Sequence, residues 1–165
     1  MLSVEYLAGL FDGEGYIIVD HRKRATHRVE RCQIKVGISL VYKPVVQQLA
    51  DQFDGILNVN DSAHRKNPRN RIVYAWVASS KPAIAFLKMV TPYLIIKREQ
   101  AELALLLQDN IDEHYGFMRN RWLDRNDPKR LAILDYRTEL TRKIKALKKE
   151  TFDLPVNGGA LSSVQ

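Results

Sequence analysis

The sequence predicts an α+β domain in which an antiparallel sheet carries helices on one face. Segments with period-two alternation of apolar and polar residues occur in two pairs, at 16–22 with 30–40 and at 56–61 with 71–79. A helical pattern precedes each pair, and a longer helical region follows the second pair. Two hairpins separated by helices favour a sheet whose other face is left uncovered by the chain itself.

The composition indicates one domain with a basic surface. The chain has 165 residues, of which 45% are hydrophobic, which is enough to bury one core. Its formal net charge is +7 at pH 7, and a polyanion is the favoured partner of such a surface, with a merely well-solvated surface as the alternative. We expect residues 1–150 to form the domain and residues 151–165, which lack periodicity, to form a flexible tail.

The cysteine content and the apolar runs bear on the compartment. Cys32 is the single cysteine, so no intrachain disulfide can form, as is typical of a reducing compartment. No apolar run approaches a membrane-spanning length, and no signal-type stretch follows Met1. We expect a cytoplasmic protein, or one of an organellar matrix, that is neither secreted nor associated with a membrane.

The first strand pair is expected to have one apolar and one polar face. In the 30–40 strand the apolar residues are Cys32, Ile34, Val36, Ile38 and Leu40, and the polar or small residues are Arg31, Gln33, Lys35, Gly37 and Ser39. The 16–22 strand is expected to turn Ile17 and Val19 inward and Tyr16, Ile18, Asp20 and Arg22 outward. A basic hairpin loop, which includes Arg24, joins the two strands.

Helical spacing, prolines and glycines predict the other elements. The first helix is expected over 3–12, with Ser3 as its N-cap and with Gly13 and Gly15 as its stop signal. The remaining helices are expected from Pro44 to Gly55, from Pro82 to Pro92, over 98–112 and over 128–150. The segment 98–112 is too apolar all round for a surface helix. Connecting turns are expected at 62–70 and 115–126.

The uncovered sheet face is where we expect binding to double-stranded DNA. The polar residues of this face and its basic hairpin tips are Arg22, Arg24, Arg31, Gln33, Lys35, Ser39, Asn58, Asn60, Arg65, Arg69 and Arg71, with Tyr16 and Asp20 beside them. Residues of these types read base edges and contact phosphates, and a two-stranded ribbon fits the major groove. A solvated sheet face is the alternative.

The stretch Leu7-Ala8-Gly9-Leu10-Phe11-Asp12-Gly13-Glu14-Gly15 resembles the signature of the LAGLIDADG homing endonucleases. The strand with Tyr74 and Trp76, the helix from Lys81, the segment 91–103 and the element order are also similar to single-motif members, so the resemblance covers roughly residues 4–107. It implies the αββαββα fold with a saddle-shaped sheet. It also implies a site-specific DNA endonuclease that leaves 3′ overhangs at a long pseudo-palindromic site.

A single copy of the motif implies a homodimer in which the two motif helices pack at a two-fold axis. Gly9 and Gly13 are four residues apart on one helix face with Ala8 beside them, so two backbones can approach closely there. Flexible glycines before a strand are the alternative, which suits Gly15 better than Gly9. Asp12 is expected to be a mainly structural residue near the interface.

The resemblance also implies the active-site residues. Glu14 is implied as the metal ligand and Lys97 as a lysine near the scissile phosphate, the alternatives being a surface carboxylate and an ordinary helix-start lysine. Mg²⁺, or Mn²⁺, is the expected cofactor, and Ca²⁺ is expected to bind without supporting cleavage. Related enzymes often place a Gln near the end of the second strand, where this chain has Ser39 and Leu40. Leu40 cannot do that job, so Gln33, Gln47 or Ser39 does it, or no residue does.

Two other functions stay open. One is a DNA-binding protein of the same fold that does not cut, and the other is an intron RNA maturase. The presence of both carboxylates and of Lys97 favours cleavage. The histidines show no zinc-ligand spacing with Cys32. The basic run 143–149 is either a solvated helix face or a further phosphate contact.

Overall fold

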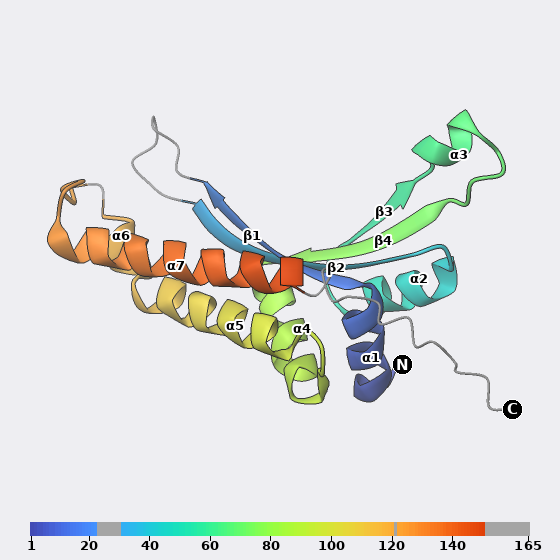
Figure 1. Cartoon of the computed structure of the whole chain (residues 1–165), viewed down its shortest axis with the longest axis horizontal. Helices are drawn as coiled ribbons and strands as arrows, with labels where there is room; N and C mark the ends of the chain where they lie inside the picture. Colours follow the sequence, from blue (N-terminus) through green and yellow to red (C-terminus); the bar gives the residue numbers. More distant parts are fainter. Residues whose placement is uncertain (23–30, 121, 151–165) are drawn as a thin grey trace, which may run out of the picture.

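The computed structural model describes residues 1–22, 31–120 and 122–150 (Figure 1). In chain order the elements are α1 (Val4–Glu14), β1 (Gly15–Arg22), β2 (Arg31–Leu40), α2 (Lys43–Gln52), β3 (Ile56–Asn60), α3 (Ser62–Lys66), β4 (Val73–Ser79), α4 (Lys81–Val90), the 3₁₀ turn η1 (Thr91–Tyr93), α5 (Arg98–Glu113), α6 (Tyr115–Met118) and α7 (Pro128–Glu150). The side chains of Arg22 and Arg31, the hairpin loop with Arg24, and the predicted tail at 151–165 lie outside what the structure describes.

The four strands form one sheet in the order β1-β2-β4-β3, and every neighbouring pair is antiparallel. Figure 1 shows the longer helices below this sheet, the short α3 at the far end of β3 and β4, and a curved upper face that the described elements leave uncovered. The α+β class and the helices on one face are therefore confirmed. We call the upper face the open face.

The strand register confirms the predicted faces of β1 and β2. Gly15 pairs with Ile38 and Ile17 with Val36, and the side chains of Ile17, Val36 and Ile38 are buried. Because side chains alternate along a strand, Tyr16, Ile18, Asp20, Gln33, Lys35 and Ser39 belong to the open face. A one-residue shift would have exchanged the two faces.

The core beneath the sheet is built around four aromatic rings. Phe86 of α4 lies 4.9 Å from Trp76 of β4, 5.2 Å from Phe11 of α1 and 5.4 Å from Phe53, measured between ring centroids. These offset and edge-on contacts fasten α1 and α4 to the middle of the sheet. They set the position of the α1 C-terminus, where the motif carboxylates lie.

Helix α1 is longer than the sequence suggested. The Ser3 hydroxyl caps it by accepting a hydrogen bond from the Tyr6 N–H, as predicted. Gly13 continues the helix instead of ending it, and Gly15 forms the C-cap with its N–H bonded to the Phe11 carbonyl. A Cβ at position 15 would lie 2.2 Å from the Phe11 ring, so this position requires glycine.

Three further differences concern the predicted turns and α5. The turns at 62–70 and 115–126 contain the short helices α3 and α6, and β4 begins at Val73. Helix α5 buries one side and is covered in part by α7, but Leu106 is 46% exposed, so the expectation of burial all round is wrong. No helix of the described residues is long and apolar enough to cross a membrane.

Candidate nuclease site at the end of the motif helix

The Asp12 carboxylate binds the backbone that leads into α5. Its Oδ2 atom accepts hydrogen bonds from the N–H groups of Ile95 and Ile96 at 2.7 and 3.1 Å, and its Oδ1 atom accepts one from Lys97 N–H at 2.9 Å. The residue is only 9% exposed. Three donors offset the unfavourable position of a carboxylate near a helix C-terminus. Asp12 thereby joins segments that are more than eighty residues apart in the chain.

The Lys97 side chain forms a second contact between the same two segments. Its Nζ atom donates a hydrogen bond to the Asp12 backbone carbonyl, which lies in the last turn of α1 and has no helical donor. Burial lowers the pKa of the Lys97 ammonium below its ordinary value, and the Asp12 and Glu14 carboxylates oppose this shift. A cation is thus held at the C-terminal end of the motif helix.

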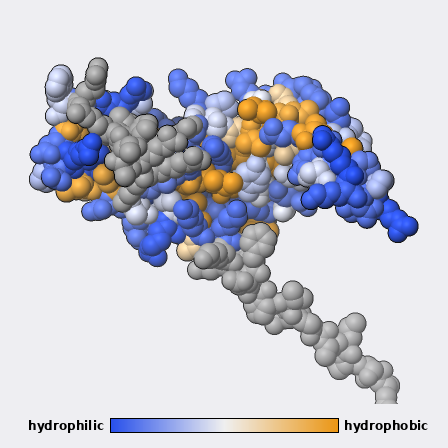
Figure 2. Space-filling view, turned by 90° about the horizontal axis from the view of Figure 1, so that it is seen from above, coloured by the Kyte–Doolittle hydropathy of each residue, from blue (hydrophilic) through white to orange (hydrophobic). Residues whose placement is uncertain are grey.

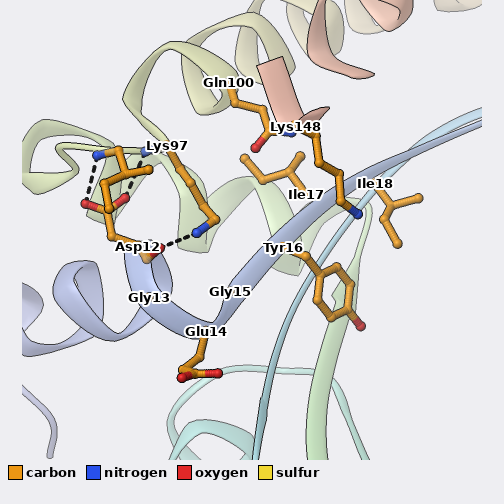
Figure 3. Close-up of a pocket in the computed structure, with 11 residues that line it drawn as sticks. Asp12, Gly13, Glu14, Gly15, Tyr16, Ile17, Ile18, Lys97, Gln100 and Lys148 are labelled. Carbon is orange, nitrogen blue, oxygen red and sulfur yellow. Dashed lines mark hydrogen bonds between the residues drawn. The ribbon is translucent and has the colours of Figure 1, made fainter. Parts of the chain in front are cut away.

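Glu14 is the last residue of α1 and is exposed. In Figure 3 its carboxylate points away from the Lys97 ammonium, with both groups on the edge of the same hollow. No cluster of three or more His, Cys, Asp or Glu side chains suited to a metal occurs in the described parts of the chain. One exposed carboxylate fits Mg²⁺, which usually keeps water and phosphate oxygens beside one or two protein carboxylates.

These residues line a cleft of about 650 Å³. The end of α1 and the start of β1 supply Asp12, Glu14 and Tyr16, while Lys97 and Gln100 come from the start of α5. Lys148 reaches the cleft from the last turns of α7 (Figure 3). The sequence singled out Glu14, Lys97 and Tyr16, which the structure brings together. It named Lys148 only as part of the basic run 143–149, and it gave Gln100 no role.

The open face carries the predicted polar residues, several of them already engaged. Lys35 Nζ lies 3.5 Å from Asp20 Oδ2, and Gln33 Nε2 donates to Ser80 Oγ at 2.8 Å. Tyr16 lies over Gly37, where a Cβ would come within 2.4 Å of the phenol. Burial of the Tyr16 phenol raises its pKa. Glycine at position 37 therefore makes room for the ring on this face.

The open face also has an apolar part, of which the sequence analysis identified only Ile18. Strand register places Val73, Ala75 and Val77 of β4 on it, together with Ile18 and Ile56, which are 43% and 66% exposed. Figure 2, which views the molecule from above, shows hydrophobic residues surrounded by hydrophilic ones. The face thus offers apolar contacts as well as hydrogen-bonding groups.

The β3–β4 end carries the remaining predicted DNA contacts. Asn58 and Asn60 are exposed on the open face, and Asn60 also stabilises the start of α3, because its Oδ1 accepts from the Ser62 hydroxyl at 2.7 Å. Arg65 is paired with Asp61 at 2.8 Å, and Arg69 and Arg71 are exposed. Within the described parts of the chain, the side chains of Asn58, Arg69 and Arg71 make no hydrogen bond or ion pair, so three of these five are available to a ligand.

The predicted dimer residues divide between the two sides of α1. Ala8 is 1% exposed and packs in the core of its own chain, so its placement at the interface is corrected. Gly9 and Gly13 are exposed, and a Cβ on either would meet nothing within 4 Å. Tyr6, at 47%, and Ile95, at 86%, are exposed apolar residues on α1 and on the segment bound by Asp12.

Solved structures with this architecture include homing endonucleases. The I-CvuI complex with its target, obtained in the presence of 2 mM Ca, has a TM-score of 0.63 at 16% identity over 87% of this chain and 80% of that one. The fold is that of the LAGLIDADG homing endonucleases. Archaeal intron-encoded I-Vdi141I complexed with DNA has a TM-score of 0.63 at 15% identity, over 87% of this chain and 82% of that one.

A third LAGLIDADG structure has a longer chain, of which this chain matches about half. I-GzeII in complex with its DNA target has a TM-score of 0.66 at 14% identity over 100% of this chain, which matches 54% of that one. No protein-family model and no curated protein sequence matches this chain. The LAGLIDADG fold is therefore assigned from the arrangement of the elements, in agreement with the resemblance recognised in the motif.

Within the LAGLIDADG fold, the candidates for the usual second-strand Gln can be placed. The Gln47 amide donates to Asp51 at 2.9 Å within α2, and the Gln33 amide donates to Ser80. Leu40 has the same strand parity as the buried Ile38 and so faces the core side. Ser39, at the end of β2 on the open face, is the remaining candidate by position.

Proposed function

We propose that the protein is a homodimeric, metal-dependent, site-specific DNA endonuclease that breaks both strands of a pseudo-palindromic duplex and leaves 3′ overhangs. One observation carries the proposal. Asp12 and Lys97 are joined through side-chain and backbone hydrogen bonds, and these bonds fix a cation in the cleft that the exposed Glu14 also lines. A purely structural motif helix would not require that arrangement at the edge of an open cleft.

The open face supports binding to double-stranded DNA. It combines asparagine, serine, lysine and tyrosine side chains with exposed Ile18 and Ile56. Polar groups of these kinds hydrogen-bond base edges and phosphates, and apolar side chains contact the methyl group of thymine. The net charge of +7 favours a polyanion. The relatives named above were solved with DNA, which agrees with this assignment.

The site residues can divide the hydrolysis between them. Glu14 would hold Mg²⁺ or Mn²⁺, which when bound lowers the pKa of an attacking water and neutralises charge on the scissile phosphate. Lys97 places its ammonium where negative charge grows in the transition state. Water adds to phosphorus, the bond from phosphorus to the 3′ oxygen breaks, and that oxygen leaves with a proton. The products are a 5′ phosphate and a 3′ hydroxyl.

The exposed side of α1 supports the homodimer. Gly9 and Gly13 leave open space along the helix, and exposed Tyr6 and Ile95 flank it. A second copy of the same face would cover these apolar groups and bring a second Glu14 to the other strand. Each subunit then supplies one carboxylate and one Lys97 to one strand.

Replacing Gly9 by leucine is expected to separate the dimer. Within one chain a Cβ at position 9 would meet nothing within 4 Å, and replacing a glycine in a helix interior gains about 1 kcal/mol of helix propensity. The partner helix, however, can no longer approach. Sedimentation velocity at micromolar concentration should show a folded monomer for the variant and a dimer for the wild type.

The matched control is Gly116→Leu. Gly116 is also an exposed helical glycine with open space around it, but it lies in α6. This variant should remain a dimer. A wild-type monomer, or a Gly9→Leu dimer of unchanged affinity, would refute the interface.

The experiment that tests the function is a cleavage selection from a randomised duplex library in Mg²⁺, with a parallel binding selection in Ca²⁺. The proposal predicts that cut ends enrich a two-fold related sequence with 3′ overhangs. Enrichment by binding without any cut ends would instead favour the non-cleaving DNA-binding alternative. Absence of both would contradict DNA recognition altogether.

A further inference from the structure

The inward face of α7 ends in a lysine. Ile133, Arg137, Leu140 and Ile144 follow one another at intervals of four, three and four residues, and each is at most 5% exposed. Leu147, three residues on, continues this stripe and is half-buried, while Lys148, four residues on, is exposed. The last turns of the helix therefore place an apolar residue and a lysine next to each other at the end of the inward face.

Two polar contacts fix α7 along α5. Arg137 Nε donates to Asn110 Oδ1 at 2.8 Å near the end of α5. At the start of α5, Gln100 Nε2 donates to the Ile144 carbonyl at 3.1 Å, and Gln100 is only 7% exposed. Gln100 stands three residues after Lys97. The last turns of α7 are therefore held against the same turn of α5 that carries the candidate nuclease lysine.

Lys148 emerges from this anchored turn into the cleft. It lines the cleft together with Glu14, Tyr16 and Lys97. In Figure 3 its ammonium lies beside the start of β1, on the opposite side of the hollow from the Lys97 ammonium. Among the described residues no carboxylate lies within ion-pairing distance of it. The cleft thus has a second cation.

Other basic residues of α7 differ from Lys148. Arg142 binds Glu139 at 2.8 Å, and Lys143 lies 3.8 Å from the same carboxylate. All three side chains are exposed, but only Lys148 of the three lines the cleft. The helix therefore carries ordinary solvated ion pairs on its outer side and a lysine directed into the cleft on its inner side.

We infer that Lys148 is a phosphate-binding residue of the cleft, which holds a DNA phosphate next to the scissile one. The inference rests on the proposed function and extends it to α7. Isoleucine side chains beside Lys148 keep part of the cleft apolar, and an ion contact there is less screened than one on an open surface. Lys97 acts on the reacting phosphate, whereas Lys148 contributes to DNA affinity.

The test compares Lys148→Gln, Lys148→Arg and the control Lys143→Gln. Kd for duplex DNA is measured from 50 to 200 mM salt, and the single-turnover cleavage rate is measured at saturating protein. Each contact contributes about 0.9 to the slope of log K against log salt, and the substitution removes one contact from each chain of the dimer, so the slope should fall by about 1.8 and binding should weaken about 60-fold near 0.1 M salt. Lys148→Gln should show both changes, with a saturated cleavage rate within about threefold of the wild type. Lys148→Arg should restore affinity and slope, and Lys143→Gln should match the wild type.

The outcomes separate this inference from the proposed function. An unchanged slope and affinity in Lys148→Gln overturn the role of Lys148, whether or not the wild type cuts DNA. A wild type that binds duplex but cuts no selected site overturns the nuclease proposal, and the slopes still decide the phosphate contact. Circular dichroism of each variant confirms that α7 is folded.

Discussion

Replacing Glu14 by glutamine is expected to lower cleavage of the selected site in Mg²⁺ by at least about 10³-fold and to leave duplex binding almost unchanged. A neutral amide is a poor ligand for a hard divalent cation, and losing a single group that stabilises transition-state charge already costs about 10²–10³-fold. Glu14 is exposed, so the substitution should not disturb folding. Single-turnover cleavage and duplex titration in Ca²⁺ measure the two effects.

Glu102→Gln is the control for this variant. Glu102 is an exposed carboxylate of α5 that does not line the cleft. Its substitution by glutamine removes the same unit of negative charge as Glu14→Gln. Its cleavage rate should equal that of the wild type. A Glu14→Gln protein that cuts at the normal rate would show that another group binds the metal.

Asp12→Asn is expected to destabilise the protein by about 3 kcal/mol, because a buried carboxylate with three backbone donors becomes an amide. The amide oxygen can replace Oδ2 and keep the N–H groups of Ile95 and Ile96. Its NH₂ group then faces the Lys97 N–H, so two donors oppose each other in a site that is 9% exposed. Urea unfolding at matched protein concentration measures the loss.

Asp51→Asn is the matched control for stability. Asp51 is an exposed carboxylate that accepts one hydrogen bond from Gln47 at 2.9 Å. The Asp51→Asn substitution should lower the free energy of unfolding by less than about 1 kcal/mol. If Asp12→Asn costs no more than Asp51→Asn, the contact between the motif helix and the start of α5 does not determine the stability of the site.

The local pattern of the sequence was sufficient for the sheet and for most helices. The alternation at 30–40 identified the buried and open sides of β2, and Ser3 marked the start of α1. The end of α1 was misplaced because Gly13 suggested a stop, whereas the Asp12 and Lys97 contacts hold that turn in helical form. A glycine signals a possible end, but tertiary contacts decide whether the helix stops there.

Only part of the site could be predicted from the sequence. Glu14 and Lys97 could be named from the motif and from the segment before α5. The three donors to Asp12 could not, since they lie 83 to 85 residues away and are backbone groups. Ala8 was misassigned because nearness to Gly9 in sequence does not put two residues on the same side of a helix. The four-residue spacing after Ile144 was the available signal for Lys148.

The most direct test of the whole account uses a mixed dimer of one wild-type chain and one Glu14→Gln chain, purified through two different affinity tags and assayed on the selected duplex in Mg²⁺. If two chains joined along α1 each provide Glu14 to one strand, this dimer should nick a single strand at close to the wild-type rate and leave the other strand at least about 10³-fold slower. Cleavage of both strands at the wild-type rate would contradict the account.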